Sequence, residues 1–465
     1  MKKQFVKPTI PSGTRDFLPT HMLRRHYVTE VIERVFKKYS YEPLHTPSIE
    51  KLSVLTGKYG EEGESLIFKI LRRGTQLEKI GRPGGPDAHT VTDFNKVVDF
   101  ALRYDLTVPL CRVVAMYQNE LTFPFKRYQI QPVWRADRPQ KGRYREFYQC
   151  DVDAVGSGSM LADAEVLAII DEVLGTLGFE AFRIRLNNRK ILTGIVEYAG
   201  ADESLATPIF ITIDKLDKIG IDGVTKELET RGLDTATVKR LLKVLEIEGD
   251  NDTVMKEIGG LLSGSAIGTE GVAETAEVLD YARGFDIPED NLSIDLSLAR
   301  GLSYYTGPIF ETIVEEPNLG SLTGGGRYDK LVGMFLGRDI PATGTSFGIE
   351  RIIDVMTQLD MLPPARTSTA VLVTLFNEET RTATLELITD LRRAGINSEL
   401  YFNAKHGIGK QLKYANRKGI PLAVIAGPDE IAEGRVTLKN LTASEQETLD
   451  QDALVDRIKG LVAGG

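Results

Sequence analysis

The run Leu292-Ser-Ile-Asp-Leu-Ser-Leu-Ala-Arg-Gly-Leu-Ser-Tyr-Tyr-Thr-Gly307 alternates apolar and polar residues as far as Ala299 and then places an arginine next. Alternation with a period of two predicts a half-buried strand over 292–299. If the strand runs one residue further, Arg300 points to the core side, where a guanidinium needs a carboxylate partner or an anionic ligand. Tyr304 and Tyr305 add two aromatic faces with hydroxyl groups. In the alternative, the strand ends at Ala299 and Arg300 pairs on the surface.

The composition is that of an ordinary globular protein with several domains: 465 residues, 42% hydrophobic and 26% charged. No apolar run approaches the roughly 20 residues that cross a bilayer, and residues 1–8 lack the apolar stretch of a secretory signal. With only Cys111 and Cys150, neither a disulfide framework nor a cysteine metal site is expected. We therefore expect a cytoplasmic protein without membrane partners. The net charge of -9 argues against nucleic-acid binding through the total charge, so any binding of a polyanion would depend on local basic patches.

The order of patterns along the chain indicates a core, an insertion and a tail. Helical spacing covers 22–39 and 161–178, and two strands with a polar loop cover 125–155. The glycine- and proline-rich segment 74–92 is expected to be a long loop near a site, and we predict a mobile flap there. Residues 195–288 are helical and acidic between strand-rich regions, which indicates an inserted helical subdomain. After a linker at 363–369, strands and helices alternate as a separate α/β domain.

Three segments could bind anions. Residues 134–145 carry five cationic residues against one acid, which suits phosphate oxygens, although a solvated hairpin tip would have the same composition. The glycines of 323–329 could cradle an anion or form a tight turn. In 343–351 a glycine-rich strand leads into a helix whose first turns carry Arg351, and a helix amino terminus favours anions. Close packing of glycine against the helix would explain that pattern equally well.

Taken together, these segments resemble class II aminoacyl-tRNA synthetases and, within that class, the histidyl-tRNA synthetase family. Residues 13–19 resemble the family's amino-terminal signature, and residues 41–47 resemble motif 1, whose proline lies at the dimer interface. Residues 133–153 and 344–351 resemble motifs 2 and 3. Residues 298–307 and 324–329 resemble the two histidine-specific motifs. The tail is similar to the family's anticodon-binding domain, so the resemblance covers nearly the whole chain.

The resemblance implies an α+β fold with three parts. The class II catalytic core, built on an antiparallel sheet, is expected at 1–194 and 289–362. A helical insertion is expected at 195–288, and a C-terminal α/β anticodon-binding domain at 370–465. It also implies a homodimer.

The same resemblance implies roles for residues that would bind ATP. Arg135 and Arg300 match the arginines on the α-phosphate and would be the catalytic residues, with Arg300 as a fixed cation. Asp137 matches the acid near the adenine amino group, and Phe147 matches the ring that stacks on adenine. Arg143 and Arg351 match residues on the outer phosphates. Mg²⁺ would accompany ATP, and no side chains are assigned to a metal.

Other positions match the residues that would bind L-histidine and tRNA(His). Asp105 and Thr107 match the pair on the α-amino group, and Gln149 matches a further contact to the amino acid. The expected imidazole readers and the phenols beside them are Asp153, Tyr305, Tyr304 and Tyr328. A carboxylate and a phenol suit a ring that offers both a donor and an acceptor. Gln140 and Lys141 are the candidates for contacting the tRNA acceptor end.

The implied reaction is attack of the histidine carboxylate on the ATP α-phosphate, followed by transfer of the histidyl group to the tRNA 3' end. The tail offers a run of cations suited to a phosphate backbone, although a solvated helix face is the commoner reason for such a run: Lys405, Lys410, Lys413, Arg417 and Lys418. The alternative is a non-catalytic, histidine-sensing regulatory paralogue. Such a protein should lack the tail and the phosphate-binding arginines, which are present here.

Overall fold

The computed structural model describes residues 6–72, 97–140, 142–299, 304–364 and 367–463. Four of the sequence predictions therefore lie outside the described residues: the loop at 74–92, Arg300, Lys141 and the strand's continuation beyond Ala299. The chain divides into two compact units, which are described separately below. One comprises Met1–Arg15 with Val28–Met361, and the other comprises Asp16–Tyr27 with Leu362–Gly465.

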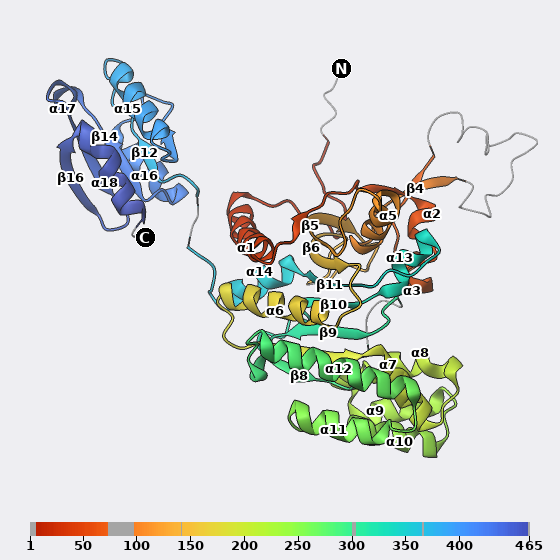
Figure 1. Cartoon of the computed structure of the whole chain (residues 1–465). Coiled ribbons are helices and arrows are strands. Elements are labelled where there is room, and N and C mark those ends of the chain that lie inside the picture. Colours follow the sequence, from red (N-terminus) through yellow and green to blue (C-terminus); the bar gives the residue numbers. More distant parts are fainter. Residues whose placement is uncertain (1–5, 73–96, 141, 300–303, 365–366, 464–465) are drawn as a thin grey trace, which may run out of the picture. The chain divides into compact units, whose positions relative to one another are not determined.

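The first unit is built on an eight-stranded sheet, shown in Figure 1. Its inner pairs are antiparallel, and the edge strands β1 and β8 pair in parallel with β5 and β7. In spatial order the strands are β1 (Glu42–Pro43), β5 (Phe125–Trp134), β6 (Glu146–Val155), β11 (Ala342–Phe347), β10 (Thr323–Arg327), β9 (Pro308–Ile313), β7 (Arg183–Asn188) and β8 (Leu292–Ile294). The predicted antiparallel core and the hairpin at 125–155 are confirmed.

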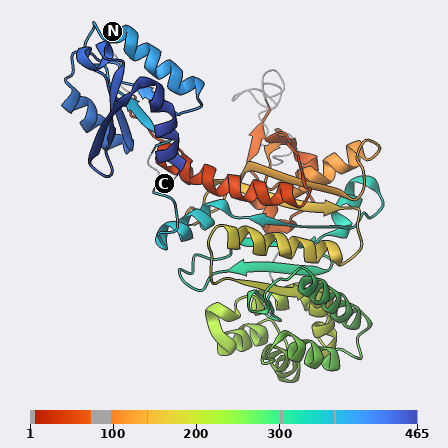
Figure 2. The ribbon, with the colours of Figure 1, turned by 60° about the vertical axis from the view of Figure 1, so that its left-hand side comes forward.

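Alternation along β6 separates the two faces of this sheet. Cys150, Val152 and Ala154 are buried on one face, and helix α6 (Leu161–Thr176) packs along the sheet (Figure 2). Phe147, Gln149, Asp151 and Asp153 share the opposite face, because side chains two residues apart point the same way. The polar side of the strand is thus free to line a site.

Further helices and a small sheet complete the first unit around the large sheet. Helix α1 spans the predicted 22–39 segment, and the strand–helix pair β11–α14 matches the predicted 343–351 pattern. The helices are α1 (Pro19–Lys38, divided between the two units), α2 (Leu52–Leu55), α3 (Gly60–Ser65), α5 (Thr107–Tyr117), α13 (Asp329–Leu336) and α14 (Ile349–Gln358). The small sheet has the order β2 (Ile49–Lys51), β4 (Val98–Leu102) and β3 (Lys69–Leu71).

A cluster of helices is inserted between β7 and β8 and packs at that edge of the sheet (Figure 1). They are α7 (Arg189–Ala199), α8 (Ala206–Ile213), α9 (Leu216–Thr230), α10 (Thr235–Leu245), α11 (Asn251–Leu261) and α12 (Ala266–Gly284), with short 3₁₀ turns at Glu203–Leu205 and Glu289–Asn291. Their apolar faces form one buried core, and Asp234, Asp250 and Ser265 cap three of the helices through backbone N–H groups. The helical insertion in the predicted fold is confirmed.

The strand predicted at 292–299 is shorter than expected, because β8 ends at Ile294. The Asp295 carboxylate accepts the Ser297 N–H at 2.9 Å, and the Asp295 carbonyl accepts the Leu298 N–H at 3.0 Å, which forms a turn. The same carboxylate pairs with Arg185. The alternation also fails, since Leu298 and Ala299 are both buried. The strand therefore ends at an aspartate that hydrogen-bonds locally and pairs with the distant Arg185, where periodicity alone predicts that it continues.

The second unit contains a five-stranded mixed sheet with helices, as the sequence predicts for the tail. Its strands, in spatial order, are β13 (Ser398–Leu400), β12 (Val371–Val373), β14 (Leu422–Ile425), β15 (Arg435–Asn440) and β16 (Glu445–Asp450). The helices are α15 (Arg381–Arg393), α16 (Ile408–Lys418), α17 (Pro428–Ala432) and α18 (Leu454–Ala463), with a 3₁₀ turn at Gln451–Ala453. Apolar residues of β12, β14, β15, α15 and α18 form its core. Within the described chain, no helix has the length and apolar character required to span a membrane.

Candidate active site

The polar face of the large sheet holds a cavity of about 220 Å³ that we call the acidic cavity. Its described lining contains four carboxylates, Asp105, Asp151, Asp153 and Glu311, against one guanidinium, that of Arg135. Every residue predicted to bind the amino acid lines this cavity: Asp105, Thr107, Gln149, Asp153, Tyr304, Tyr305 and Tyr328. Residues from four separate stretches of sequence therefore meet in one place.

Asp105 follows β4 and is held at the floor of the acidic cavity. Its Oδ1 accepts the Tyr59 hydroxyl at 3.0 Å and the Val108 N–H at 3.1 Å. Burial raises the pKa of this carboxyl, while the Val108 N–H lowers it. Its Oδ2 is buried with no hydrogen-bond partner in the described part of the chain. An unpaired buried acceptor is costly, so this oxygen is suited to a donor brought by a ligand.

Asp153 lies further along β6 and is fixed from two sides. The Tyr328 hydroxyl donates to its Oδ1 at 2.5 Å, and the Arg127 guanidinium lies 2.9 Å from its Oδ2. Burial raises the pKa of the carboxyl, and Arg127 opposes that rise. Gly344 is opposite Asp153 on β11, and a Cβ there would lie 2.2 Å from Asp153 Oδ1. Position 344 of β11 therefore requires glycine for the Asp153 carboxylate to keep its position.

Three tyrosine rings form one wall of the acidic cavity. The ring centroids of Tyr304 and Tyr305 are 5.1 Å apart, and those of Tyr304 and Tyr328 are 5.9 Å apart, both edge to face. Burial raises the pKa of all three phenols well above the ordinary value. The phenols therefore stay neutral at physiological pH and can both donate and accept hydrogen bonds.

A second cavity of about 270 Å³ adjoins the first, and we call it the arginine cavity. The two share Arg135, Gln149, Gly324 and Ser346 as lining residues, so they meet along one border. Every described residue predicted to bind ATP lines it: Arg135, Asp137, Arg143, Phe147 and Arg351. Guanidinium groups are suited to phosphate oxygens, and the ring of Phe147 offers a flat apolar face.

Arg135 lies at the border between the two cavities and is held by its neighbours. Its Nε donates to the Tyr104 carbonyl at 3.2 Å. Its guanidinium carbon lies 4.3 Å from the centre of the Tyr104 ring and 5.2 Å from that of Phe147. Only one of its N–H groups is used by that hydrogen bond, and a guanidinium carries five. The remaining donors can reach an anion at the border.

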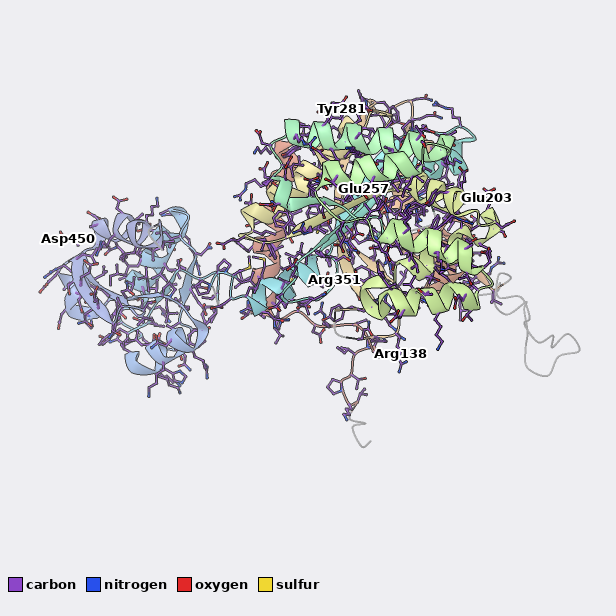
Figure 3. The ribbon with its side chains drawn as sticks, turned by 90° about the horizontal axis from the view of Figure 1, so that it is seen from below. Arg138, Glu203, Glu257, Tyr281, Arg351 and Asp450 are labelled. Atoms are coloured by element: carbon purple, nitrogen blue, oxygen red, sulfur yellow. The ribbon has the colours of Figure 1, made fainter. Side chains whose placement is uncertain are left out.

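The other two arginines, Arg351 and Arg143, also line the arginine cavity. Arg351, labelled in Figure 3 at the start of α14, donates to the Ser321 carbonyl at 2.9 Å. Arg143 has a side chain that is 53% exposed and lies 3.7 Å from Asp137. Gln140 forms an isolated bridge with Arg143 on the β5–β6 loop and is exposed. Lys141, its predicted companion in tRNA binding, lies outside the described residues.

Sequence reasoning missed Asp151, Arg127 and Glu311. Asp151 is two residues from Asp153 on the same face of β6, so alternation offered a signal for it. Arg127 is the residue opposite Asp153 on β5, and only the strand register reveals that pairing. Glu311 and Gly324 face each other across β9 and β10, again by register. The pairing between strands that are distant in sequence cannot be predicted from the local pattern of residues.

The fold and site define a class II aminoacyl-tRNA synthetase: an antiparallel sheet with an amino-acid-sized acidic cavity next to an arginine-lined one. The model of the family described as histidyl-tRNA synthetase matches residues 13–352, and that of an anticodon binding domain matches residues 370–461. The chain belongs to the histidyl-tRNA synthetase family.

Relatives and solved structures agree with this membership over nearly the whole chain. The chain is 45% identical over 457 residues to the histidine--tRNA ligase of Cytophaga hutchinsonii, covering 97% of this chain and 99% of that protein. It is 46% identical over 448 residues to that of Porphyromonas gingivalis, covering 96% and 98%. The crystal structure of histidyl-tRNA synthetase from Nostoc sp. PCC 7120 matches with a TM-score of 0.84 at 34% identity, covering 98% and 99%.

Proposed function

We propose that this chain joins L-histidine to tRNA(His) at the expense of ATP, through a histidyl-adenylate formed where the two cavities meet. The shared border between the acidic and arginine cavities is the observation that carries the proposal. An amino acid in the acidic cavity directs its carboxylate toward Arg135, which also lines the cavity suited to a triphosphate. Holding two substrates in reacting geometry supplies much of the rate in such reactions.

In the first step, a carboxylate oxygen of histidine attacks the α-phosphorus of ATP. The bond from that phosphorus to the bridging oxygen breaks, and pyrophosphate leaves with the electron pair. Arg135 supports this step as a fixed cation on the α-phosphate, where negative charge concentrates. Arg300 is proposed for the same task from its motif alone, since it lies outside the described residues. In the second step, a tRNA 3'-terminal hydroxyl attacks the histidyl carbonyl carbon and loses its proton to solvent, the bond from that carbon to the phosphate oxygen breaks, and AMP leaves with the electron pair.

The acidic cavity fits the groups of histidine that carry N–H donors. Besides Asp105 Oδ2, the amide oxygen of Gln149 is buried without a hydrogen-bond partner in the described chain. The α-ammonium group offers three donors, and we assign it to Asp105, Thr107 and Gln149. We assign the imidazole to Asp153 and Tyr305, with Tyr304 and Tyr328 packed beside them. We assign the adenine to Phe147 and Asp137 and the outer phosphates to Arg143 and Arg351.

We propose that Mg²⁺ enters with ATP on its outer phosphates, where it would neutralise charge as pyrophosphate leaves. The carboxylate of Glu350 lines the arginine cavity, and an oxygen ligand of this kind suits the ion. Glu350 Oε1 accepts the Tyr148 N–H at 3.3 Å, which fixes the position of this carboxylate. The described residues contain no group of three or more side chains able to hold a metal by themselves.

For tRNA, we propose that the second unit binds the anticodon through α16 and the loop before it. Lys405, Lys410, Lys413 and Arg417 are exposed there, whereas Lys418 is paired with Glu399 and contributes less than the sequence suggested. Phe402 is 90% exposed beside these cations and can stack on a base. Replacing Lys410 and Lys413 with glutamate should lower tRNA charging strongly and leave pyrophosphate exchange unchanged. Equal loss of both activities would contradict this assignment.

We also propose a homodimer formed through the β2–β4–β3 sheet. Ile49 and Phe100 share the outer face of this sheet and are 52% and 46% exposed. Pro47, the proline of the predicted motif 1, lies two residues before Ile49. A second copy that covers these apolar side chains would remove their cost in water. Sedimentation of an Ile49→Asp variant should give a monomer, whereas a dimer of unchanged affinity would exclude this face.

The deciding experiment for the proposed function is amino-acid-dependent exchange of labelled pyrophosphate into ATP. Exchange should require histidine, and the acylation of tRNA(His) should follow in the same preparation. No exchange with histidine, or equal exchange with proline, would contradict the proposal. The alternative of a histidine-sensing paralogue without catalysis is not favoured, because the homologues are named as ligases over nearly the full chain. A cytoplasmic location remains a prediction.

A further inference from the structure

Asp151 is a buried carboxylate in the acidic cavity for which the proposed reaction has so far no use. Its residue is 2% exposed, and its Oδ1 has no hydrogen-bond partner in the described chain. Its Oδ2 lies 3.9 Å from the nearest guanidinium nitrogen of Arg127, whereas Asp153 lies 2.9 Å from the same group. Arg127 therefore forms its closer ion pair with Asp153. The second carboxylate is left with only a distant counter-charge.

The register of the sheet places the Ser346 hydroxyl, a neutral hydrogen-bond partner, opposite Asp151. Gln129 and Ser346 are the residues opposite Asp151 on β5 and β11. The Gln129 amide donates to Thr46 Oγ1 at 2.8 Å, and Ser346 Oγ accepts the Gln149 amide at 3.0 Å. The Ser346 hydroxyl lowers the pKa of Asp151, but burial outweighs it and raises that pKa to about 7. The carboxyl thus titrates in the physiological range.

The charged and titratable groups around Asp151 come from every element that packs against it. They are Arg127 on β5, Asp153 on β6, Asp105 after β4, Glu311 on β9, Arg135 at the cavity border, and the Tyr305 phenol with Arg189 beyond it. With Asp151 ionised, two neighbouring carboxylates face one guanidinium. This part of the cavity then has an excess negative charge, which a cationic ring would neutralise.

We propose that Asp151 is a further specificity-determining residue, which adds a second negative charge to the imidazole subsite and favours a substrate ring protonated on both nitrogens. The inference rests on the proposed function. An imidazolium presents two N–H donors. These donors match a site with two carboxylate acceptors better than a site with one carboxylate and one hydrogen-bond donor. Side chains of similar shape without a titratable ring gain nothing from the extra charge. Asp151 therefore discriminates against such competitors through its charge, whereas the tyrosine phenols discriminate through the shape of the cavity.

The test is an Asp151→Asn variant, which keeps the shape and removes the charge. KM for histidine in pyrophosphate exchange is measured at pH 6 and pH 8 in the variant and the parent protein. At pH 8 Asp151 is ionised, and the variant should show a KM about tenfold higher. At pH 6 the parent must first ionise Asp151, which costs about tenfold per pH unit, so the ratio should fall toward about one. Both proteins are measured at each pH with the same histidine solution, so the degree of protonation of the free histidine is common to both measurements.

Three readouts separate this role from a structural one. KM for ATP should be the same in both proteins at both pH values. Because burial raises the folded-state pKa of Asp151, its stabilisation is present at low pH and is lost as pH rises toward about 7. The Asn variant should therefore melt at a higher temperature than the parent at pH 8. Asp171→Asn is a matched control, because the pKa of that half-buried carboxyl on α6 is also raised by burial.

A KM ratio near one at pH 8, or a ratio equally large at pH 6 and pH 8, would overturn the proposal. So would an identical change in the Asp171→Asn control. These outcomes are distinct from failure of the proposed function, because that function is judged by whether the parent protein exchanges pyrophosphate with histidine at all.

Discussion

The two adjoining cavities are built differently. In the acidic cavity the functional side chains hold one another, as Tyr59 holds Asp105 and as Tyr328 and Arg127 hold Asp153. In the arginine cavity, Arg135 and Arg351 are each anchored by a backbone carbonyl, and Arg143 is largely in solvent. The acidic cavity is therefore shaped before its ligand arrives, and the arginine cavity keeps freedom to adapt. A side that must distinguish one amino acid from others benefits from rigidity.

The largest effect is expected from Gly344→Ala. The added Cβ would lie 2.2 Å from Asp153 Oδ1 and 2.5 Å from the Val152 carbonyl, so the carboxylate or a strand must move. We expect kcat/KM for histidine in pyrophosphate exchange to fall by about 10³-fold, which is about 4 kcal/mol. Gly175→Ala on α6 is the control for a glycine-to-alanine change, since its Cβ meets no atom within 4 Å and the residue lines neither cavity. A Gly344→Ala protein with activity within tenfold of the parent would show that the acidic cavity is not rigid.

Tyr328→Phe tests the same rigidity through one hydrogen bond. The variant removes the hydroxyl that donates to Asp153 at 2.5 Å and leaves the ring in place. Hydrogen bonds to charged groups contribute about 1.5–3 kcal/mol, so KM for histidine should rise about 10- to 100-fold. Steady-state exchange kinetics at varied histidine and varied ATP check this. An equal rise in both KM values would mean that the two cavities are not independent.

Arg143→Ala should have a smaller effect, confined to the arginine cavity. Because this side chain is 53% exposed and screened by solvent, we expect KM for ATP to rise by about three- to tenfold with KM for histidine unchanged. The difference from the parent should shrink as salt is added. A loss as large as that of Gly344→Ala would remove the contrast between the two cavities.

The smallest expected effect is on stability and concerns Glu227, which lies outside both cavities. Its contribution to stability has the opposite pH dependence from that of Asp151. Lys215 and Arg231 lower the pKa of Glu227 from 4.5 to about 2. A depressed folded-state pKa gives stability that is present above pH 4.5 and is lost as pH falls toward 2. Melting temperatures of Glu227→Gln and the parent should therefore differ at pH 7 and converge on acidification. Glu229→Gln on the same helix is the matched control, and a difference that persists at low pH would contradict this assignment.

Much of the site could be found from the sequence because its residues lie in short runs. The segment 133–153 and the segment 344–351 each carry a local pattern, and every predicted ATP- or histidine-binding residue that the structure describes lines one of the two cavities. The residues that support them were not found. Arg127 reaches Asp153 across a strand pair, and Gly344 leaves room for Asp153 from a strand about 190 positions away in sequence.

The sequence by itself determined the elements, because the spacing of apolar residues and the placement of glycine and capping residues act over a few positions. It also determined the family, since the motifs stand in contiguous runs. Tertiary structure decided the end of β8, where Asp295 turns the chain and pairs with the distant Arg185. It also decided the charge of the acidic cavity. The carboxylates become buried and share Arg127 only when β5, β6 and β11 lie side by side. Contacts between residues so far apart in sequence cannot be read from a local pattern.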